Sequence, residues 1–428
     1  MKRLNSVLTW TCMLLGLLVQ FSCNKSNETL PSSFGTSTDD NDAPLVASLP
    51  LNWTAELYAE TASSIEQNCS LSDINLHNGN PVFELRTATE SGIWKVNAQN
   101  GDILWKWKDE ASTGGFQNHS LQGDVLYFTD EGGKAYKLDL NSGQKLWEVE
   151  LELQPGEWAV FDGDDIYLPE QYEANGHRLT GIQRIRMPLR EKAVIFRAPD
   201  RDNSSEEYIG RPALTDCDGN SVLIFTRHYK KEGRKLSFAR IIAWDVPLQR
   251  SMWFLPVQQH PGQRTPHSSD IYVEGGNVFF ADAKFLYNIQ LANGNCSWRS
   301  PVSIAPSQPI QMAFGPTDLI YYNGAGWLAS LQRKTGKKNW SKSVAYKEAA
   351  TCLSLVGEHV VLGHSELDCY STANGRRLTR YCTADLYPAY SDREGASLRA
   401  GFLAHAEEDQ QLVVAAERHL ICLGSSSQ

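Results

Sequence analysis

The chain has 428 residues, of which 41% are hydrophobic and 10% aromatic, and its formal net charge is −10. Such a surplus of acids argues against sequence-independent binding to nucleic acid, whose phosphates need a basic partner. A chain of this length is too long for an ordinary single-core domain unless it is built from repeats.

The first 22 residues have the features of a secretion signal. Lys2 and Arg3 precede an apolar stretch at residues 8–21, which is too short to be read as a membrane-spanning helix. The stretch ends at Ser22 and Cys23. A small residue before a cysteine resembles a bacterial lipoprotein signal, in which the cysteine is lipidated and becomes the first residue. We therefore expect lipidation at Cys23. The alternative is an ordinary signal peptide in which this cysteine has no role.

Residues 23–49 are polar, with the sequence SSFGTSTDDND at their centre. This composition is typical of a flexible tether. The sequence thus predicts a signal peptide at 1–22, a tether at 23–49 and a folded region at 50–425.

The folded region repeats one pattern in which a glycine is followed four residues later by a tryptophan. The pattern recurs about every 40 residues, the period of propeller repeats. Its members are Gly101 and Trp105, Gly143 and Trp147, Gly294 and Trp298, and Gly336 and Trp340. Two incomplete copies carry Trp253 without the glycine and Gly375 without the tryptophan.

Each repeat contains short alternating runs separated by turn residues, which predicts about four β-strands per repeat. The expected architecture is an all-β, eight-bladed propeller. The last unit, residues 398–423, lacks an outer strand, and residues 51–57 are expected to supply it from the other end of the chain. A count of seven is the alternative, because the third blade is weakly marked. The expected blades are residues 62–110, 115–153, 156–198, 205–256, 267–300, 308–345, 348–383 and the closing unit.

The pattern Tyr-Lys-Leu-Asp-x-x-x-Gly-x-x-x-Trp, complete at residues 136–147, resembles the PQQ-like (quinoprotein-type) propeller repeat. The resemblance implies eight blades, with each tryptophan packed between neighbouring blades. It covers both quinoprotein dehydrogenases and non-enzymatic lipoproteins of the BamB-like branch. The dehydrogenases need an adjacent pair of cysteines beside the quinone, and this chain has none. We therefore expect no PQQ and no enzymatic activity.

No cysteine or histidine spacing predicts a metal site, and none is expected. One disulfide among Cys352, Cys369, Cys382 and Cys422 is an open alternative to small buried thiols. Propeller topology brings the starts of the innermost strands to one mouth of the central channel. The candidate binding residues there are Gln117, Asn118, His119, Trp158, Arg211, His267, Gln311 and Arg399. The alternative is that they only line a water-filled channel.

These features predict a lipoprotein scaffold of the cell envelope that binds other envelope proteins. We expect it at the outer membrane, on the periplasmic or surface side, with membrane contact through the lipid anchor only. The sequence leaves the inner membrane open. Alternative functions are a divergent PQQ-dependent dehydrogenase and an envelope protein that binds a ligand or glycan.

Overall fold

A computed structural model describes residues 51–56, 70–86, 91–108, 115–154, 156–174, 176–197, 204–231, 237–257, 270–282, 284–302, 310–324, 326–344, 352–363, 367–381, 400–406, 411–416 and 419–424. The chain divides into two compact units, residues 1–39 and 40–428. The described residues all belong to the second unit. They contain strands and turns but no helix, and the strands form eight antiparallel sheets.

The first four sheets follow one another along the chain. Blade 1 contains β2 (Ser70–His77), β3 (Asn80–Arg86), β4 (Ser91–Val96) and β5 (Ile103–Lys108). Blade 2 contains β6 (Phe116–Gln122), β7 (Val125–Asp130), β8 (Lys134–Asp139) and β9 (Lys145–Glu150). Blade 3 contains β10 (Val160–Asp162), β11 (Asp165–Ala174), β12 (His177–Arg186) and β13 (Glu191–Phe196). Blade 4 contains β14 (Ser204–Ile209), β15 (Ala213–Cys217), β16 (Asn220–Lys231), β17 (Ser237–Asp245) and β18 (Arg250–Val257).

The remaining sheets complete the ring. Blade 5 contains β19 (Tyr272–Glu274), β20 (Asn277–Ala281), β21 (Phe285–Gln290) and β22 (Cys296–Pro301). Blade 6 contains β23 (Gln311–Phe314), β24 (Asp318–Tyr322), β25 (Trp327–Gln332) and β26 (Lys338–Ser343). Blade 7 contains β27 (Cys352–Val356), β28 (His359–Gly363), β29 (Leu367–Ser371) and β30 (Arg377–Tyr381). Blade 8 contains β31 (Ala400–Ala406), β32 (Gln411–Ala416), β33 (His419–Gly424) and β1 (Leu51–Glu56).

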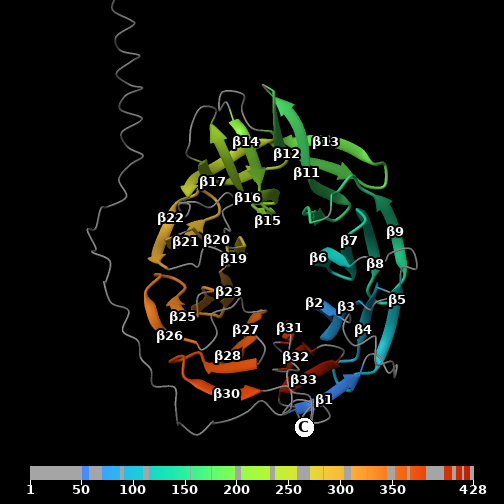
Figure 1. The fold of residues 1–428 in the computed structure, drawn as a ribbon, viewed down its shortest axis with the longest axis vertical. Helices are drawn as coiled ribbons and strands as arrows, with labels where there is room; N and C mark the ends of the chain where they lie inside the picture. The colour runs from blue at the N-terminus through green and yellow to red at the C-terminus, as the bar shows by residue number, and fades with distance from the viewer. Residues whose placement is uncertain are drawn as a thin grey trace, which may run out of the picture. The chain divides into compact units, whose positions relative to one another are not determined.

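The blades are arranged in a closed ring with their first strands innermost, except in blade 4, where the second strand, β15, is innermost (Figure 1). Strand β31 contacts both β27 of blade 7 and β2 of blade 1. The two ends of the described chain meet in blade 8, where β1 pairs with β33. The eight-bladed prediction, with a closing strand from the N-terminal side, is therefore confirmed, and the weakly marked third blade forms a complete sheet. Closure in this way pairs an edge of β33 that would otherwise be open.

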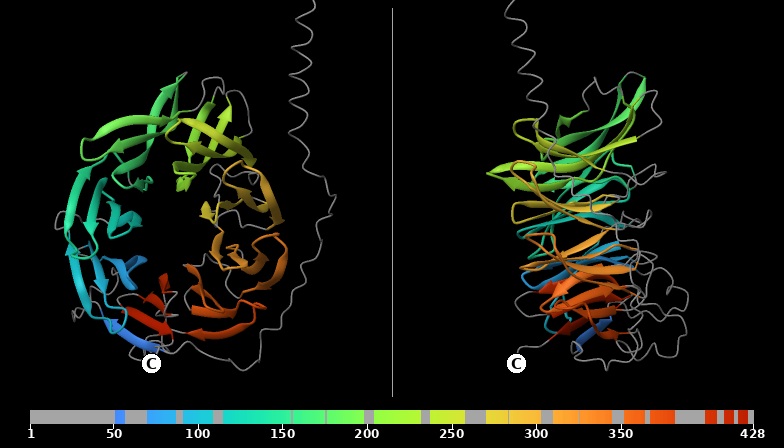
Figure 2. Two further views of the ribbon diagram at one scale, coloured as in Figure 1. Left: turned by 180° about the vertical axis from the view of Figure 1, so that it is seen from behind. Right: turned by 90° about the vertical axis from the view of Figure 1, so that its left-hand side faces the viewer.

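Strand direction gives the ring two distinct faces. The connection face carries the links between blades and the hairpins between second and third strands. The turn face carries the other two turns of each blade, including the glycine turn before each outer strand. The two faces are seen edge-on in Figure 2. Each innermost strand starts at the connection face, whereas each outer strand starts at the turn face.

The repeated glycine and tryptophan meet across the boundary between neighbouring blades. At Gly336 of blade 6, a Cβ atom would lie 2.5 Å from Cδ2 of Trp298 in blade 5, and φ is +68°. The Trp298 indole also donates a hydrogen bond of 2.9 Å from Nε1 to the backbone oxygen of Arg333. Glycine is required here for two reasons: its positive φ and the ring that covers it. The same contact joins Trp105 to Gly143, Trp253 to Gly294, and Trp340 to Gly375.

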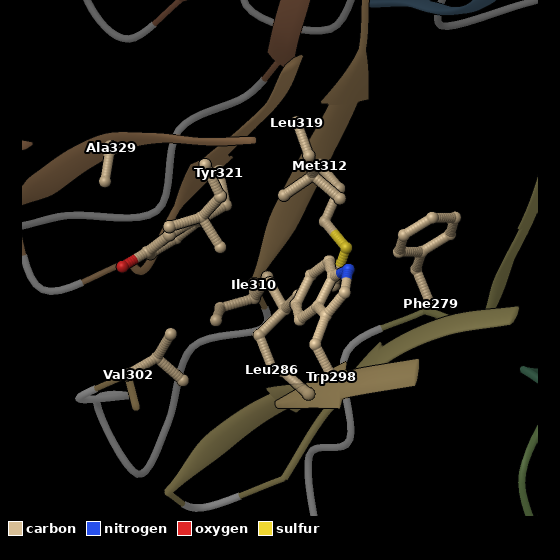
Figure 3. Close-up of a cluster of buried hydrophobic side chains, with 11 residues drawn as sticks. Phe279, Leu286, Trp298, Val302, Ile310, Met312, Leu319, Tyr321 and Ala329 are labelled. Carbon is tan, nitrogen blue, oxygen red and sulfur yellow. The ribbon is translucent and has the colours of Figure 1, made fainter. Parts of the chain in front are cut away.

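Apolar side chains from both blades fill each boundary around this contact. Figure 3 shows the cluster between blades 5 and 6, in which Trp298 lies beside Phe279, Ile310 and Met312. Trp298 is 8% exposed. The tryptophans are thus packing residues, as the repeat resemblance implies.

The boundary between blades 7 and 8 lacks both partners of the repeated contact. Blade 7 carries Thr379 in place of the tryptophan. Blade 8 has no glycine turn, because its third and outer strands come from opposite ends of the chain and no turn joins them. In blade 8, Trp53 pairs with Cys422 beside a register shift. Trp147 pairs with Lys137 beside the same kind of shift. Trp53 on the closing strand β1 therefore occupies the register position that the repeated tryptophan has in blade 2.

Blades 3 and 4 depart from the rule together. The left-handed turn position is held by Arg190 (φ 56°) and Gln249 (φ 48°) instead of glycine. Blade 3 has Val194 where the tryptophan would stand, and Val194 is 42% exposed. The boundary between these two blades must therefore be held by other contacts.

A chain of polar contacts that runs from the buried Lys95 and His77 to the exposed Asp124 joins blades 1 and 2 at the turn face. Lys95 donates from Nζ to His77 Nδ1 (2.7 Å) and to the backbone oxygen of Leu140 (3.0 Å). His77 Nε2 lies 2.7 Å from Asp124 Oδ1. The hydrogen bond from His77 lowers the pKa of Asp124, and burial lowers the pKa of Lys95. Because the ammonium group has no lone pair, His77 must accept at Nδ1 and donate at Nε2.

Three cysteines with described side chains are free thiols: Cys217, Cys296 and Cys369. Burial raises the pKa of the Cys369 thiol to about 12. Cys369 therefore fits the buried-thiol alternative rather than a disulfide. Cys23, and with it the predicted signal and tether, lies outside the described residues.

Candidate partner-binding surface

The structure places the predicted channel-mouth residues at the starts of innermost strands, as expected from the topology. Gln117, Asn118 and His119 lie on β6, Gln311 opens β23, and Trp158 and Arg211 directly precede β10 and β15. His267 and Arg399 lie outside the described residues. The described candidates are therefore distributed over blades 2, 3, 4 and 6. They lie on the same face of the ring but on different blades.

Two of these residues are engaged in holding blades together. Asn118, at φ 59° in a register shift of β6, donates from Nδ2 to Thr129 Oγ1 (2.9 Å) and to the Glu157 backbone oxygen (3.2 Å). Trp158 is 7% exposed and donates from Nε1 to the Ile209 backbone oxygen (3.1 Å). Their polar groups are thus used inside the fold, and we do not retain them as ligand contacts.

The other candidates differ in exposure. His119 stacks on Phe128 with ring centroids 5.9 Å apart, Gln311 is half-buried, and Arg211 is exposed. Within the described ranges, no group of three or more His, Cys, Asp or Glu side chains could hold a metal ion. The role of these residues as binding residues stays a prediction.

The connection face is uneven because blades 3 and 4 have the longest strands. Strands β11 and β12 have 10 residues each, β16 has 12 and β17 has 9. The additional lengths of β11 and β12, which are the described residues of 170–181, and of β16 and β17, which are residues 226–231 and 237–240, project from the ring at the top of Figure 1. Strand β14 pairs with the additional part of β16. We call the described residues of 170–181, 204–209 and 226–240, with the adjoining β18, the wall.

Contacts made by the wall replace the missing glycine–tryptophan contact between blades 3 and 4. The backbone oxygens of Glu207 and Ile209 accept hydrogen bonds from Thr180 Oγ1 (3.2 Å) and from Trp158 Nε1. Both carbonyls belong to the edge of β14 that faces blade 3. Phe196 of blade 3 also packs edge-on against Phe225 and Trp244, at centroid distances of 5.0 and 5.1 Å. These two blades are therefore joined near the connection face, in place of the glycine and tryptophan contact at the turn face.

A buried ion pair fixes the base of the wall. Arg227 Nε and Nη2 donate to the two carboxylate oxygens of Glu207, at 2.8 and 3.2 Å. Their side chains are only 2% and 0% exposed. Two charges removed from water at this depth need nearly ideal geometry, which the bidentate fork supplies. The pair ties β14 to β16 and gives the wall a rigid support.

Aromatic rings and arginines continue outward from this pair. The guanidinium of Arg227 lies 4.5 Å from the centroid of Tyr229, and that of Arg240 lies 5.3 Å from Tyr229 and 5.1 Å from Phe254. Phe254 is 58% exposed. Arginine and aromatic side chains, phenylalanine included, are enriched at protein interfaces. The stack therefore presents an exposed, preorganised anchor at its outer end.

A second exposed ring lies on the opposite side of the same sheet. Tyr208 is 49% exposed and stacks on His228, with centroids 6.2 Å apart. Burial lowers the pKa of His228 to about 4, so its ring is neutral near pH 7. On blade 3, Arg197 pairs with Glu170 and lies 4.9 Å from the centroid of Tyr172.

The only signal for the wall in the sequence is indirect. The third blade lacks the repeated glycine and tryptophan, which indicates an irregular blade, but strand pairing over 10 residues cannot be inferred from their loss. The basic tip at residues 231–235 reads as solvated surface from sequence. Only Lys231 of it is described, as the last residue of β16.

The strand order and the repeated glycine–tryptophan contacts define this chain as an eight-bladed β-propeller. The model of the family described as "Outer membrane protein assembly factor BamB" matches residues 51–166, which span blades 1 and 2. Among the curated proteins, none matches the chain.

Solved structures show the same fold at low identity. BamB from Moraxella catarrhalis is 16% identical with a TM-score of 0.55, covering 89% of this chain and 99% of that one. The Saccharomyces cerevisiae protein Sqt1 is 10% identical with a TM-score of 0.55, covering 85% and 98%. The computationally designed protein Ika8 is 13% identical with a TM-score of 0.52, covering 84% and 97%. At these identities the similarity shows the fold alone. The described residues contain no apolar helix long enough to cross a membrane.

Proposed function

We propose that this protein is a lipid-anchored scaffold of the cell envelope that binds another envelope protein through the wall of blades 3 and 4. The observation that carries the proposal is the exposed ring of Phe254 at the end of a stack that begins in a buried ion pair. An exposed aromatic on a rigid support loses little entropy on binding, which favours protein recognition. The match to the BamB family over blades 1 and 2 supports the same class of role.

The proposed anchor is a lipid on Cys23, followed by the tether at residues 24–49. The basic start of the chain and the short apolar stretch that ends at Ser22 and Cys23 support it. Mass spectrometry of the mature protein tests this part. A diacylglyceryl-modified Cys23 is expected, and a mature chain without this modification would contradict it.

The proposal assigns no catalysis and no quinone cofactor, because the sequence has no adjacent cysteine pair to lie beside a quinone. Titration with PQQ and calcium is expected to give no spectral change. Dye-linked dehydrogenase activity after the titration would overturn this part of the proposal.

Partner binding is tested by photo-crosslinking in intact cells from a photoreactive amino acid at position 254. A defined crosslinked species is expected, and Arg240→Glu should abolish it. The matched control is position 341 in blade 6, since Ser341 follows Trp340 just as Phe254 follows Trp253, and it is also exposed. A crosslink from position 341 but none from position 254 would reject the wall as the binding surface.

A further inference from the structure

The turn face carries a second exposed surface, which the proposed function does not use. Eight large hydrophobic side chains are strongly exposed among the described residues, and five of them lie where outer strands begin or in the turns just before them. We call these five the turn-face rim: Ile103, Leu104, Leu146, Leu189 and Leu248. All belong to the consecutive blades 1–4.

The repeat provides an internal comparison for this surface. Leu189 and Leu248 occupy the position directly before the left-handed turn residue, and they are 73% and 57% exposed. The same position is Asn293 in blade 5 and Thr335 in blade 6, and both are exposed. Single exposed leucines need no explanation, but apolar residues at matched positions of successive blades form a pattern. The apolar character is therefore a property of one side of the ring and not of the fold.

Blades 3 and 4 share a special outer turn. Their turns read Met187-Pro188-Leu189-Arg190 and Val246-Pro247-Leu248-Gln249, so each places a leucine at the tip after a proline. Proline restricts the backbone before the tip, which lowers the entropy lost when the leucine is buried. Two turns with the same sequence pattern, at the same place on adjacent blades, thus present their leucines on the same face.

The charges beside these leucines have the opposite sign to the whole protein. Arg190 follows Leu189 and Arg250 closes the second turn, and both are exposed. Lys192, on the outer strand of blade 3, is paired with Glu152 at 3.2 Å, and Glu191 follows Arg190. Apolar tips that each have an arginine within two residues match the boundary between acyl chains and anionic headgroups.

The position of the tether points to the same surface. The first described strand, β1, pairs antiparallel with β33 and so begins at the turn face with Leu51. The preceding residues 24–50 therefore join the fold on the turn face. As a flexible coil they would reach roughly 25–30 Å. An anchor at Cys23 would hold the turn face, rather than the connection face, close to the membrane.

We infer that the turns of blades 3 and 4 insert Leu189 and Leu248 into the surface of an anionic lipid bilayer. The inner turns of the same blades carry Asp164, Asp216 and Asp218, which oppose contact of the whole face with anionic lipid. The ring therefore rests tilted, with its blade 3–4 rim lowest and the wall directed away from the bilayer. The net charge of −10 gives no indication of this contact, because it is a sum over the whole chain and does not show the two arginines, Arg190 and Arg250, beside the leucines.

This inference rests on the proposed membrane anchorage but not on the partner, so its test omits the lipid. The mature chain with Cys23→Ala is mixed with vesicles of phosphatidylcholine, with or without phosphatidylglycerol, and vesicle-bound protein is measured by flotation. We expect binding to the mixed vesicles, weaker binding to phosphatidylcholine alone, and weakening by salt. The double variant Leu189→Asp, Leu248→Asp should lower the partition coefficient on the order of a hundredfold, about tenfold for each leucine.

The matched control is Asn293→Asp, Thr335→Asp, which adds the same charge at the same turn positions of blades 5 and 6. It should change the partition coefficient by about twofold at most, since these sites lie outside the proposed contact. Equal losses in the two double variants would overturn the inference, as would wild-type protein that binds neither vesicle. A wild-type dimer that the leucine variant converts to a monomer would also overturn it, by assigning the rim to self-association.

The Arg240→Glu variant separates this inference from the proposed function. It should float with vesicles like the wild type, even though it loses the crosslink at position 254. Loss of flotation in this variant would contradict the assignment of two separate surfaces.

Discussion

Replacement of Gly336 by alanine tests the physical basis of the repeat. The new Cβ would lie 2.5 Å from two atoms of the Trp298 ring, so the indole must move. Movement would disturb its hydrogen bond to the Arg333 oxygen and the packing shown in Figure 3. We expect a cost of about 1–2 kcal/mol for the left-handed backbone. Overpacking adds roughly 1–3 kcal/mol.

The chain contains a matched control for the backbone part of this cost. Gly276, in the inner turn of blade 5, has φ +72° and nothing within 4 Å of an added Cβ. Gly276→Ala should therefore cost only the backbone contribution of about 1–2 kcal/mol. Urea unfolding, followed by tryptophan fluorescence and by circular dichroism, measures both variants against the wild type. In a Trp298→Ala background, the two glycine variants should become equally costly.

The reasoning would be refuted if Gly336→Ala and Gly276→Ala destabilised the wild-type protein equally. The left-handed backbone would then explain the glycine without the tryptophan. It would also be refuted if the excess cost of Gly336→Ala persisted after Trp298 was removed.

Three further predictions concern buried charges and thiols. Arg227→Met should lower the free energy of unfolding by about 3–5 kcal/mol, because it leaves Glu207 charged and buried. Adding Glu207→Gln to this variant should restore part of the lost stability, and a double variant with no gain in stability would show that the ion pair is not the cause. Burial lowers the pKa of Lys95 below its ordinary 10.5, so the unfolded chain binds this proton more tightly and stability should rise with pH between the folded and unfolded pKa values. The difference in urea midpoint between wild type and Lys95→Met measures this slope, and a difference that does not depend on pH would contradict it. The exposed Cys296 should react with a thiol reagent in the native protein, whereas Cys369, buried with its pKa raised to about 12, should react only on unfolding; equal rates would contradict the burial of Cys369.

The repeat explains why the fold could be predicted and the candidate site could not. The Gly143 and Trp147 pattern marks the turn and the docking position in every regular blade, so the blade borders followed from its spacing. Closure by residues 51–56 followed from a missing strand at one end and an extra strand at the other. Both inferences use contacts that recur, and repetition made them visible in a single sequence.

The wall depends on contacts that occur once. Arg227, Glu207 and Tyr229 come together only because β14 pairs with the additional part of β16, and no spacing in the sequence indicates that pairing. Trp158 lies just before an innermost strand, as predicted, but its indole forms a hydrogen bond between blades 3 and 4. Propeller topology thus predicts where the candidate residues lie, whereas burial and hydrogen bonding determine which of their side chains are available to bind a partner.

Crosslinking from position 254 in intact cells measures directly whether the wall binds an envelope protein. We expect one defined protein adduct that depends on Arg240 and is absent from position 341. A pattern in which both positions give the same products, or in which Arg240→Glu leaves the adduct unchanged, would contradict it.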